Sequence, residues 1–599
     1  MPHETRKAAR AAAARDAATP SSPLPAGGGS ATRHRRSVVR RRILLALGIV
    51  LIVVLAALAW LAFRALTVKD ELAAAQKLVT STDDDETTSE RVSAIASHAA
   101  AAAEASGDPV WLAAELVPVV GDNLRAVRLA AQSLDLLTND LAVPALEAMS
   151  ADESGSPLEL LLPLIQEQAP AVSEMADAVA DVKESPWLVE QVRSGIEQVD
   201  GVLQTAAPAL EVVPPLLGAD GAKNYLLVFQ NNAETLPLGG SAASQTLIAV
   251  DNGAMSIVAQ AGSGDFTEDV AVDVPVDESA LTLYTKYLVD HVNNTTSRPD
   301  FPTAAQLLRA FWQRDIAADQ IDAVMSVDPL ALARILKATG PITAGDVEIT
   351  SDNAVSVLLS EVYVWWNPYA SEEEAAASDA FFAEVAAAVF AKIAAGDFDV
   401  EEMLSAVGES IDQGSIMMWS DDADLSPYLE GQRVAGILPT DNDEQSTVGV
   451  FYRNSSGSKI DYYMDSSIAV EKTCDATAST FTAQTTLTLD LTQDEADALP
   501  EYVQDVQWGS SLFGTDIFIY GPPGTTFVSA TVDGRKVSVV HTDISDLGHP
   551  VASFGAYLAP GESVTVTATF SGTGDFGPLE VRSTPMINST DVSIADGCS

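Results

Sequence analysis

A short segment of this chain combines amide side chains with glycines. Its six candidate ligand-binding residues are Gln230, Asn231, Asn232, Glu234, Gly239 and Gly240. Amides supply hydrogen-bond donors and acceptors, and glycines let a backbone approach a ligand. We expect the apolar run from Tyr225 to Phe229 to be a strand that ends here, so that these residues form a binding loop. A rigid polar turn that bonds its own backbone uses the same residues.

Two other motifs have the spacing of known chemistry but lack its context. Ser456 and Lys459 match the S-x-x-K pattern of penicillin-binding enzymes, yet no S-D-N or K-T-G companion occurs, and a polar turn is expected. Gly572, Gly574 and Gly577 have dinucleotide-loop spacing, but a proline and a strand-like run follow instead of a helix. We therefore assign no catalytic residue.

The sequence also gives no support for a metal or a cofactor. None of the histidines beyond the apolar segment described below forms an i, i+4 pair with a carboxylate between them. The acidic run from Asp83 to Glu86 is more typical of a solvated linker than of a cation site. We predict neither a metal centre nor a bound cofactor.

The only two cysteines are Cys474 and Cys598. Both follow the apolar segment, so a location outside the membrane would favour a disulfide between them. Two free thiols are the alternative.

Aromatic residues are concentrated between Trp365 and Tyr369. Such a cluster can line a sugar- or lipid-binding surface, but aromatic side chains more often lie in a core. We favour the core.

The elements that must position these residues change along the chain. Residues 64–217 are rich in alanine, and apolar residues recur there every three or four positions, for example Val189, Val192, Ile196, Val199 and Leu203. This pattern predicts a stalk of antiparallel helices. We interpret Gly121-Asp122-Asn123 as the end of one helix and the cap of the next.

Residues 218–440 are predicted to be an α/β domain because strands and helices alternate there. A hairpin is expected around Asn252-Gly253, and a strand over 321–327. Asp328 and Pro329 then predict the cap and first turn of a helix. Two more helices are expected over 352–365 and 372–395.

Residues 441–599 contain short strand-like runs separated by turn residues, which predicts a β-sandwich. The expected strands cover 448–452, 459–464, 480–491, 516–520, 526–532, 536–541 and 563–570.

Residues 43–63 are 21 consecutive uncharged residues that follow an arginine-rich run. A helix of this length spans about 30 Å, the thickness of a bilayer core. Because arginines collect on the cytoplasmic side, we expect residues 1–42 to be a disordered cytoplasmic tail and the remainder to lie outside. A cleaved signal peptide is the competing interpretation.

The net charge of −51 bears on the partners of the chain. The tail is basic, so the residues beyond the membrane are strongly acidic and would repel a phosphate backbone. We therefore expect a membrane lipid bilayer as a partner and no nucleic acid.

One part of the chain resembles a known bacterial family. The run from Lys223 to Glu234, followed by Gly239-Gly240, is similar to the signature of the domain of unknown function 4012, as are 300–305, 327–329 and 339–341. The resemblance extends over about 110–465. It implies a membrane-anchored protein without an assigned activity, associated with the cell envelope or exopolysaccharide.

The order of elements is also similar to the LytR-CpsA-Psr fold, whose enzymes transfer glycopolymers from polyprenyl-pyrophosphate carriers. Those enzymes place Asp and Arg where this chain has Gln230–Asn232, and their later paired arginines have no counterpart in 351–366. Leu236 and Ser241 also depart from the unknown-function family, which usually has an arginine and often an aromatic residue there. Pyrophosphate is normally held by fixed cations, which neutral amides cannot replace. The resemblance therefore implies the fold and the location of this chain but assigns it no catalytic residue.

The sequence thus predicts a multidomain α+β protein with one transmembrane helix, a helical stalk, a LytR-CpsA-Psr-like α/β domain and a C-terminal β-sandwich. We expect a binding or assembly factor for surface glycopolymer or exopolysaccharide, and lean against an enzyme. The alternative is a glycopolymer phosphotransferase, which would need Arg298, Arg309 or Arg314 near the amide segment. A signalling receptor ranks last, because the 42-residue tail shows no folded output domain.

Overall fold

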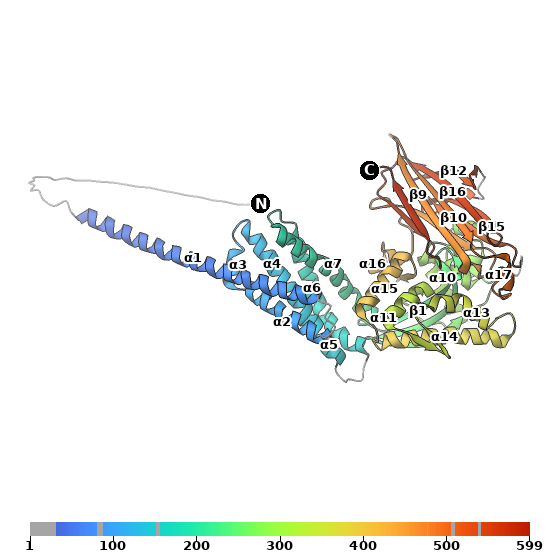
Figure 1. The fold of residues 1–599 in the computed structure, drawn as a ribbon, viewed down its shortest axis with the longest axis horizontal. Helices are drawn as coiled ribbons and strands as arrows, with labels where there is room; N and C mark the ends of the chain where they lie inside the picture. The colour runs from blue at the N-terminus through green and yellow to red at the C-terminus, as the bar shows by residue number, and fades with distance from the viewer. Residues whose placement is uncertain are drawn as a thin grey trace, which may run out of the picture.

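The computed structural model describes residues 31–80, 88–150, 156–423, 425–475, 477–504, 509–536 and 541–598. The chain has a helical N-terminal region, a central five-stranded sheet with helices around it, and two further sheets, of six and five strands, toward the C-terminus (Figure 1). This arrangement confirms the mixed α+β class. The acidic run from Asp83 to Glu86 lies outside the described residues.

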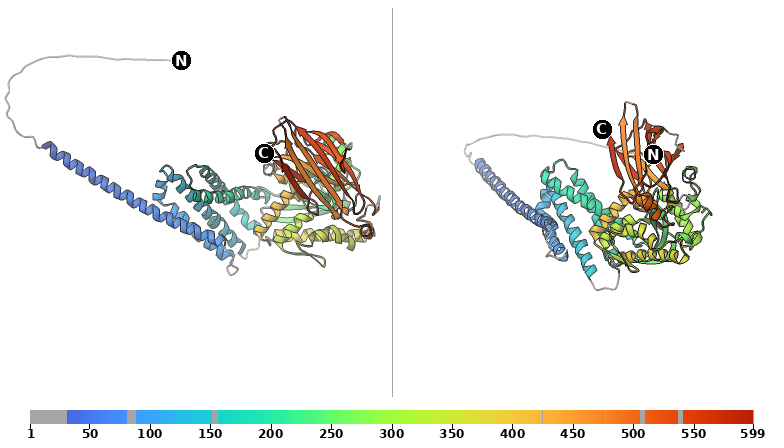
Figure 2. Two further views of the ribbon diagram at one scale, coloured as in Figure 1. Left: turned by 45° about the horizontal axis from the view of Figure 1, so that its top comes forward. Right: turned by 45° about the vertical axis from the view of Figure 1, so that its right-hand side comes forward.

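Helix α1 (Ala31–Thr80) extends away from the rest of the molecule at its N-terminal end (Figure 2). Its part Leu45–Val79 is long and apolar enough to cross a membrane, and the most apolar 18-residue window has a mean hydropathy of 2.9. The helix continues beyond Phe63, where we expected the membrane span to end, and its C-terminal part packs along α2 (Thr88–Ser106). The predicted span and the beginning of the predicted stalk are therefore one continuous helix.

The helical region buries the periodic apolar positions that the sequence displays. Val172, Val179, Ile196 and Leu203 lie in one core. After α2 the elements are α3 (Pro109–Ala114), α4 (Val120–Asp135), the π-helical η1 (Leu136–Ala142), α5 (Val143–Ser150), α6 (Pro157–Lys183) and α7 (Glu190–Leu216).

The helix boundary predicted at Gly121-Asp122-Asn123 is shifted in the structure. These residues form the first turn of α4, whose N-cap is Val119. Glycine is needed at position 121 for close packing, because a Cβ atom there would lie 1.9 Å from the carbonyl oxygen of Glu115.

The central sheet has the order β3-β2-β1-β4-β7. Its strands are β1 (Lys223–Leu236), β2 (Gly239–Asp251), β3 (Ala254–Gly262), β4 (Ala323–Val327) and β7 (Ile416–Ser420). Strands β1 and β4 are parallel, and the other neighbours are antiparallel. Alternate side chains face opposite sides, so Leu226 and Val228 pack with α10 (Phe301–Asp315) while Tyr225 packs on the other side.

Helices and short elements surround this sheet. They are η2 (Ser263–Asp265), α8 (Glu278–Tyr284), α9 (Tyr287–Asp290), η3 (Val292–Ser297), α11 (Pro329–Thr339), α12 (Ala354–Ser356), the π-helical η4 (Val357–Glu361), α13 (Val362–Trp365), α14 (Glu372–Ala394), α15 (Val400–Gln413), α16 (Ser426–Leu429) and η5 (Arg433–Ala435), with the small hairpin β5 (Ile342–Ala344) and β6 (Val347–Ile349). The predicted cap is confirmed, because Asp328 Oδ1 accepts the Ala331 N–H at 2.8 Å.

Strand β1 corrects one prediction. We expected it to end at Phe229, but it continues through Gln230–Asn232 to Leu236. The backbone of Gln230 and Asn231 pairs with β2, and the register is irregular between Asn231 and Thr235. The predicted β2–β3 hairpin is confirmed, and Asn252 and Gly253 adopt the positive φ values of its turn.

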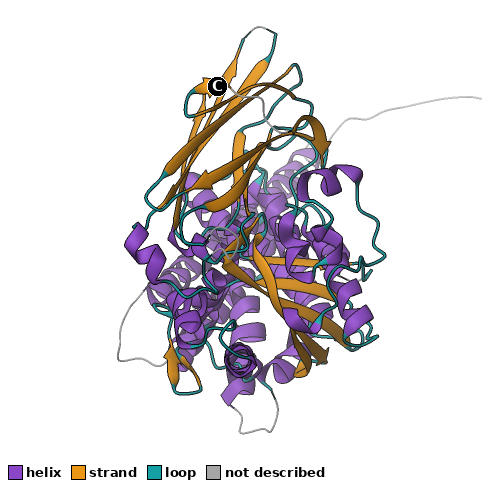
Figure 3. Cartoon of the chain, turned by 90° about the vertical axis from the view of Figure 1, so that its right-hand side faces the viewer, coloured by secondary structure: helices purple, strands orange, loops and turns teal. Residues whose placement is uncertain are grey.

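The C-terminal strands form two sheets that share buried residues in one core (Figure 3). One sheet has the order β13-β12-β16-β10-β9-β18 and the other β14-β15-β11-β8-β17. The strands are β8 (Ser446–Asn454), β9 (Met464–Cys474), β10 (Ser479–Leu489), β11 (Phe513–Tyr520), β12 (Thr526–Val532), β13 (Arg535–Lys536), β14 (His541–Asp546), β15 (His549–Leu558), β16 (Ser563–Gly572), β17 (Leu579–Ser583) and β18 (Asp591–Asp596).

One predicted strand in this region is wrong. Residues 460–463 form the 3-10 helix η6 (Ile460–Tyr463), and β9 begins only at Met464. The short helix α17 (Gln493–Ala498) was not expected. Residues 537–540, within the strand predicted over 536–541, lie outside the described residues.

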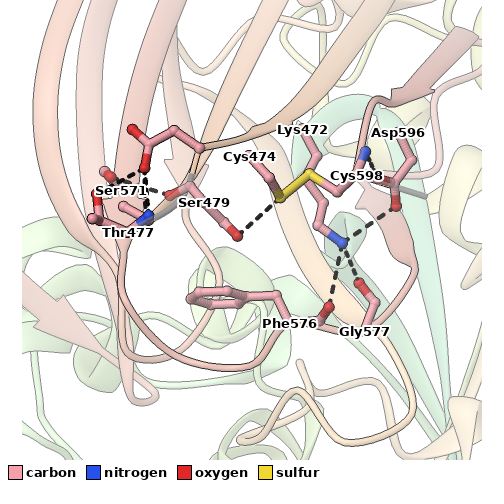
Figure 4. The surroundings of a disulfide bond; sticks show 11 residues. Lys472, Cys474, Thr477, Ser479, Ser571, Phe576, Gly577, Asp596 and Cys598 are labelled. Atoms are coloured by element: carbon pink, nitrogen blue, oxygen red, sulfur yellow. Dashed lines mark hydrogen bonds and ion pairs between the residues drawn. A yellow bond between two sulfur atoms is a disulfide. The ribbon is translucent and has the colours of Figure 1, made fainter.

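A disulfide joins Cys474, at the end of β9, to Cys598, two residues beyond β18 (Figure 4). The predicted pairing is therefore confirmed. Beside it, Lys472 Nζ donates to the carbonyl oxygen of Gly577 at 2.8 Å and contacts Asp596.

The glycines with dinucleotide-loop spacing lie at a strand end and in a loop, and no helix follows them.

Arg298 links the central region to the C-terminal sheets. Its guanidinium group is buried and contacts Asp300 at 2.8 Å and Asp546, on β14, at 2.7 Å. Tyr520 OH donates to the same Asp546 carboxylate at 3.0 Å. Since charges this deep are kept only with close partners, this network fixes the two regions against each other.

Candidate functional site

A cavity of about 690 Å³ lies beside the amide-rich half of β1. Residues of β1, β2 and β3 line one side, and residues of α11, η4 and α14 line another. Gly457, Lys459 and Tyr502, from the C-terminal region, complete its wall. The cavity is therefore built from segments far apart in the sequence.

The two glycines of the predicted site allow β1 and β2 to approach closely. A Cβ atom at Gly240 would lie 2.2 Å from the backbone of Asn231. One at Gly239, where φ is 127°, would lie 2.6 Å from Gln230 Oε1. The Gly240 N–H instead donates to Gln230 Oε1 at 2.8 Å. The glycines shape the hairpin and do not line the cavity.

Glu234 and Lys459 form an ion pair in the cavity wall. Ser241 Oγ donates to the second oxygen of Glu234 at 2.5 Å, and the Lys459 ammonium lies 4.1 Å from the centre of the Tyr502 ring. Burial alone would lower the pKa of Lys459, but the Glu234 carboxylate raises it above its ordinary value. Lys459 is therefore a fixed cation whose charge is already matched.

The two asparagines have different positions. Asn231 lines the cavity and donates to Tyr363 OH at 2.7 Å. Asn232 is fully buried and donates to Asp328 at 3.0 Å and to the Pro585 carbonyl oxygen at 3.2 Å. Asn232 thus holds β1 against the start of α11 and does not face the cavity.

Two glutamine side chains in the cavity wall have polar atoms without a protein partner. Gln230 Nε2 and both polar atoms of Gln245 are buried and find no hydrogen bond among the described residues. Gln245 has an exposed fraction of 1%. Buried amides are normally bonded, because an unmade hydrogen bond costs about 1–3 kcal/mol. These groups are suited to a ligand that supplies donors and acceptors.

The rest of the lining is divided by chemistry. The strands contribute mainly polar residues, among them Ser241, Ser244, Thr246 and Gln260. The helices contribute mainly apolar ones: Leu332, Leu358, Leu359, Ala375, Phe382, Ala383, Val385 and Ala386. Such a cavity suits an uncharged ligand with hydroxyl groups on one side and hydrocarbon on the other.

Three arginines considered from the sequence are engaged elsewhere. Arg298 binds the buried aspartates described above, Arg309 contacts Asp421 at 2.9 Å, and Arg314 bonds Asp315 and nearby carbonyl groups. None of them lines the cavity, and Lys459 is the only basic residue that does so among the described residues.

The aromatic cluster is divided between core and cavity. Trp366 packs against the core next to α14, and the Trp365 side chain is 39% exposed. Tyr369 lines the cavity with Tyr363 and Tyr502, and its ring lies edge-on to Tyr502 at 4.8 Å. The preference for a core location therefore holds for Trp366 but not for Tyr369.

One group of side chains has the composition of a metal site. Ligand atoms of Asp269, Asp290 and His291 lie within 4.8 Å of one another. However, Lys286 Nζ contacts both carboxylates at 3.0 Å, and His291 Nδ1 bonds Asp290 at 2.7 Å. The Lys286 ammonium group already pairs with both carboxylates and neutralises one of their two charges.

Sequence reasoning found Gln230, Asn231 and Glu234 but missed Gln245, Lys459 and Tyr502 as cavity residues. The sequence predicts Lys459 to end an S-x-x-K motif and to begin a strand over 459–464, and neither pattern indicates a cavity wall. Its partner is 225 positions away, so local sequence held no signal for the contact. The one available indication of a further cavity residue was the glutamine at position 245, because a buried strand position is rarely occupied by glutamine.

The family described as a protein of unknown function, DUF4012, matches residues 220–363. This match runs from β1 into the start of α13 and supports the resemblance to the unknown-function family. No curated protein matches the chain.

Two solved structures show limited likeness. A Legionella pneumophila protein described as a candidate nutrient-binding protein has 9% identity and a TM-score of 0.14 over 21% of this chain and 42% of its own. The Lin1025 protein from Listeria innocua has 12% identity and a TM-score of 0.21 over 38% of this chain and 84% of its own. The chain thus spans less than half of the first protein.

Proposed function

We propose that this chain is a membrane-anchored protein of the bacterial cell envelope that binds a surface glycan or exopolysaccharide, free or lipid-linked, in the cavity beside β1. The observation that carries the proposal is the pair of buried glutamines, Gln230 and Gln245, whose unpartnered amide atoms line that cavity. Sugar hydroxyl groups both donate and accept hydrogen bonds, which is what such amides require.

The remaining lining supports the same ligand class. Tyrosine side chains and the apolar helix face can pack against the C–H surfaces of sugar rings. The apolar face could equally hold the hydrocarbon of a lipid carrier. Because Lys459 is neutralised by Glu234, the cavity offers no free cation for a strongly anionic ligand.

The location rests on α1 and the disulfide. An arginine-rich run precedes the apolar part of α1, which favours a cytoplasmic N-terminus. The Cys474–Cys598 disulfide is typical of oxidising compartments outside the membrane. We further propose that the central domain is LytR-CpsA-Psr-like and that the two C-terminal sheets, which share one core, form a β-sandwich.

The alternative function, a glycopolymer phosphotransferase, is less well supported. Transfer from a pyrophosphate carrier needs fixed positive charge at the phosphates. The cavity lining contains no arginine among the described residues. We therefore favour binding over transfer.

The test is ligand binding to the full chain in lipid nanodiscs. The probes are a neutral hexose oligosaccharide and the same oligosaccharide linked to polyprenyl phosphate, which separate glycan from lipid recognition. Replacing Gln245 with leucine should weaken binding of the recognised probe about tenfold, the loss expected for a buried hydrogen-bonding group. Gln198→Leu, at an exposed position of α7, is the matched control. Failure of both probes to bind, or equal binding by Gln245→Leu, would refute the proposal.

A further inference from the structure

Exposed apolar side chains gather at one end of the helical region. In the loop between α3 and α4 they are Leu116, Val117 and Val119, with Val120 at the start of α4, and in the loop between α6 and α7 they are Trp187 and Val189. Leu116 is 86% exposed and Trp187 57%. We call these residues the apolar tip. A contiguous exposed apolar patch usually marks an interaction surface.

The two loops of the apolar tip are held together by one side chain. Asn123 Nδ2 donates to the carbonyl oxygens of Val119 at 3.0 Å and Trp187 at 2.9 Å, and Asn123 Oδ1 accepts the Val189 N–H at 2.8 Å. Ser185 Oγ also donates to Asp122 at 2.6 Å. The apolar tip is therefore one surface and not two unrelated loops.

The backbone of this tip is strained at an exposed valine. Val119 has φ 71° and ψ −48°, and the Val120 N–H donates to the Pro118 carbonyl oxygen at 2.9 Å. This is the rare, strained form of the γ-turn, which a β-branched residue avoids. Strain that persists in a fold points to a functional constraint on that side chain. In water, glycine or asparagine would fill this position at less cost.

The apolar tip carries no uncompensated charge of its own. Glu115 is the one ionisable residue between Trp111 and Val120, and both of its carboxylate oxygens accept from Arg128, at 2.7 and 3.0 Å. Exposed Glu184 and Glu190 flank Trp187. Their charges would limit the tip to the headgroup region of a bilayer, where tryptophan is favoured.

The helix that leads into the apolar tip, α3, packs at the end of the predicted membrane span. Asp108, the N-cap of α3, accepts from Trp60 Nε1 at 3.0 Å and from Arg64 Nε at 3.3 Å, and both donors are on α1. Trp111 is buried against Val68 and Leu61 of α1. Helix α3, which leads into the apolar tip, therefore packs on α1 where the exposed apolar surface of α1 gives way to packed surface. In Figure 1, α3 lies at the end of the helical region from which α1 projects.

We propose that the apolar tip inserts into the surface of the same bilayer that α1 spans, so that the ectodomain rests on the membrane at two places. The inference builds on the proposed membrane anchoring by α1. A second contact would fix the tilt of the helical region and hence the height of the glycan cavity above the lipid. Acidic surfaces elsewhere would not assist this contact, so apolar burial must provide it.

The test uses depth-dependent fluorescence quenching on the full chain in liposomes. Both native cysteines form the disulfide, so one introduced cysteine gives one labelling site. Leu116→Cys carrying an environment-sensitive fluorophore should emit at shorter wavelength and lose most of its emission when the lipids carry nitroxide groups. Asp220→Cys, beyond the opposite end of α7, should show neither effect.

Val53→Cys, within the predicted membrane span, separates the two proposals. If position 53 is quenched and position 116 is not, the anchoring stands and the insertion of the tip is refuted. If position 53 is also unquenched, the anchoring itself fails. A shift to shorter wavelength at position 116 without nitroxide quenching would mean that protein covers the tip, which also refutes insertion into lipid.

Discussion

The ammonium group of Lys459 contacts the carboxylate of Glu234, although 225 positions separate the two residues. Glu234 lies on β1, inside the segment that matches the family of unknown function, and Lys459 lies just before η6 in the C-terminal region. The pair thus joins two regions of the chain exactly where both contribute to the cavity wall.

Replacing Lys459 with methionine should destabilise the folded chain by about 2–3 kcal/mol, because Glu234 would lose its partner. The value lies below the range for fully buried pairs, since 23% of the Glu234 side chain remains exposed. Chemical unfolding of the single variants and of Lys459→Met/Glu234→Gln would give the coupling energy. Arg125→Met removes one partner of an ion pair whose side chains are 45% and 71% exposed, and it should have little effect. If the effects of the two single substitutions simply add in the double variant, Lys459 and Glu234 do not stabilise each other and the prediction is wrong.

Replacing Gln245 with leucine should stabilise the chain when no ligand is present. The substitution removes amide atoms that have no protein partner and adds apolar surface of similar volume. The expected gain in unfolding free energy is about 1–2 kcal/mol, whereas Gln198→Leu should change it by less than about 0.5 kcal/mol. Thermal unfolding measures both. A loss of stability would mean that the amide is already satisfied.

The free energy of unfolding should depend on pH because Asp461 titrates at different pH values in the folded and unfolded chain. Burial raises the pKa of this carboxyl from 3.8 to about 7, against hydrogen bonds from Asn454 and Thr235. Between these values the folded state keeps a proton that the unfolded state has released, so rising pH lowers the unfolding free energy by up to about 1.4 kcal/mol per unit.

Asp461→Asn removes this contribution and leaves the other carboxylates in place. Its stability relative to the unaltered chain should therefore improve as the pH rises from about 4 to about 7 and stay constant above that window. Urea unfolding at several pH values measures the difference. A difference independent of pH would show that Asp461 titrates near its ordinary value.

Replacing Cys474 and Cys598 with serine should lower the unfolding free energy by about 4–5 kcal/mol in the chain-entropy model, because the bond closes a long loop. The sequence separation is 124 residues. Strand β18 is exposed along its length and pairs only with β9. Hydrogen exchange should consequently increase first in residues 591–596. Unchanged protection there would show that pairing alone holds the strand.

Local signals predicted much of the fold. The cap at Asp328, the turn at Asn252-Gly253 and the helix over 372–395 all depend on contacts between near neighbours in the sequence. The disulfide followed from the number and compartment of the cysteines. These features need no knowledge of the distant parts of the chain.

Predictions failed where distant residues decide the conformation. Gln230 and Asn231 would favour a turn in isolation, but pairing with β2 keeps them in a strand. Residues 459–464 have an apolar, strand-like composition, yet η6 forms there and Asp461 accepts the Thr235 N–H of β1 at 2.9 Å. The candidate site was therefore predicted in part, since its β1 residues are local and its remaining walls are not.

Because Lys459 and Tyr502 contribute to the cavity, the cavity depends on residues outside the segment that matches the family. The family match ends at residue 363, but a fragment cut there would leave the Glu234 carboxylate without its lysine partner and one wall of the cavity missing. Homologous segments recognised by sequence are often exchanged as autonomous building blocks. In this chain the matched segment alone does not build the cavity, because Lys459 and Tyr502 of the C-terminal region complete its wall.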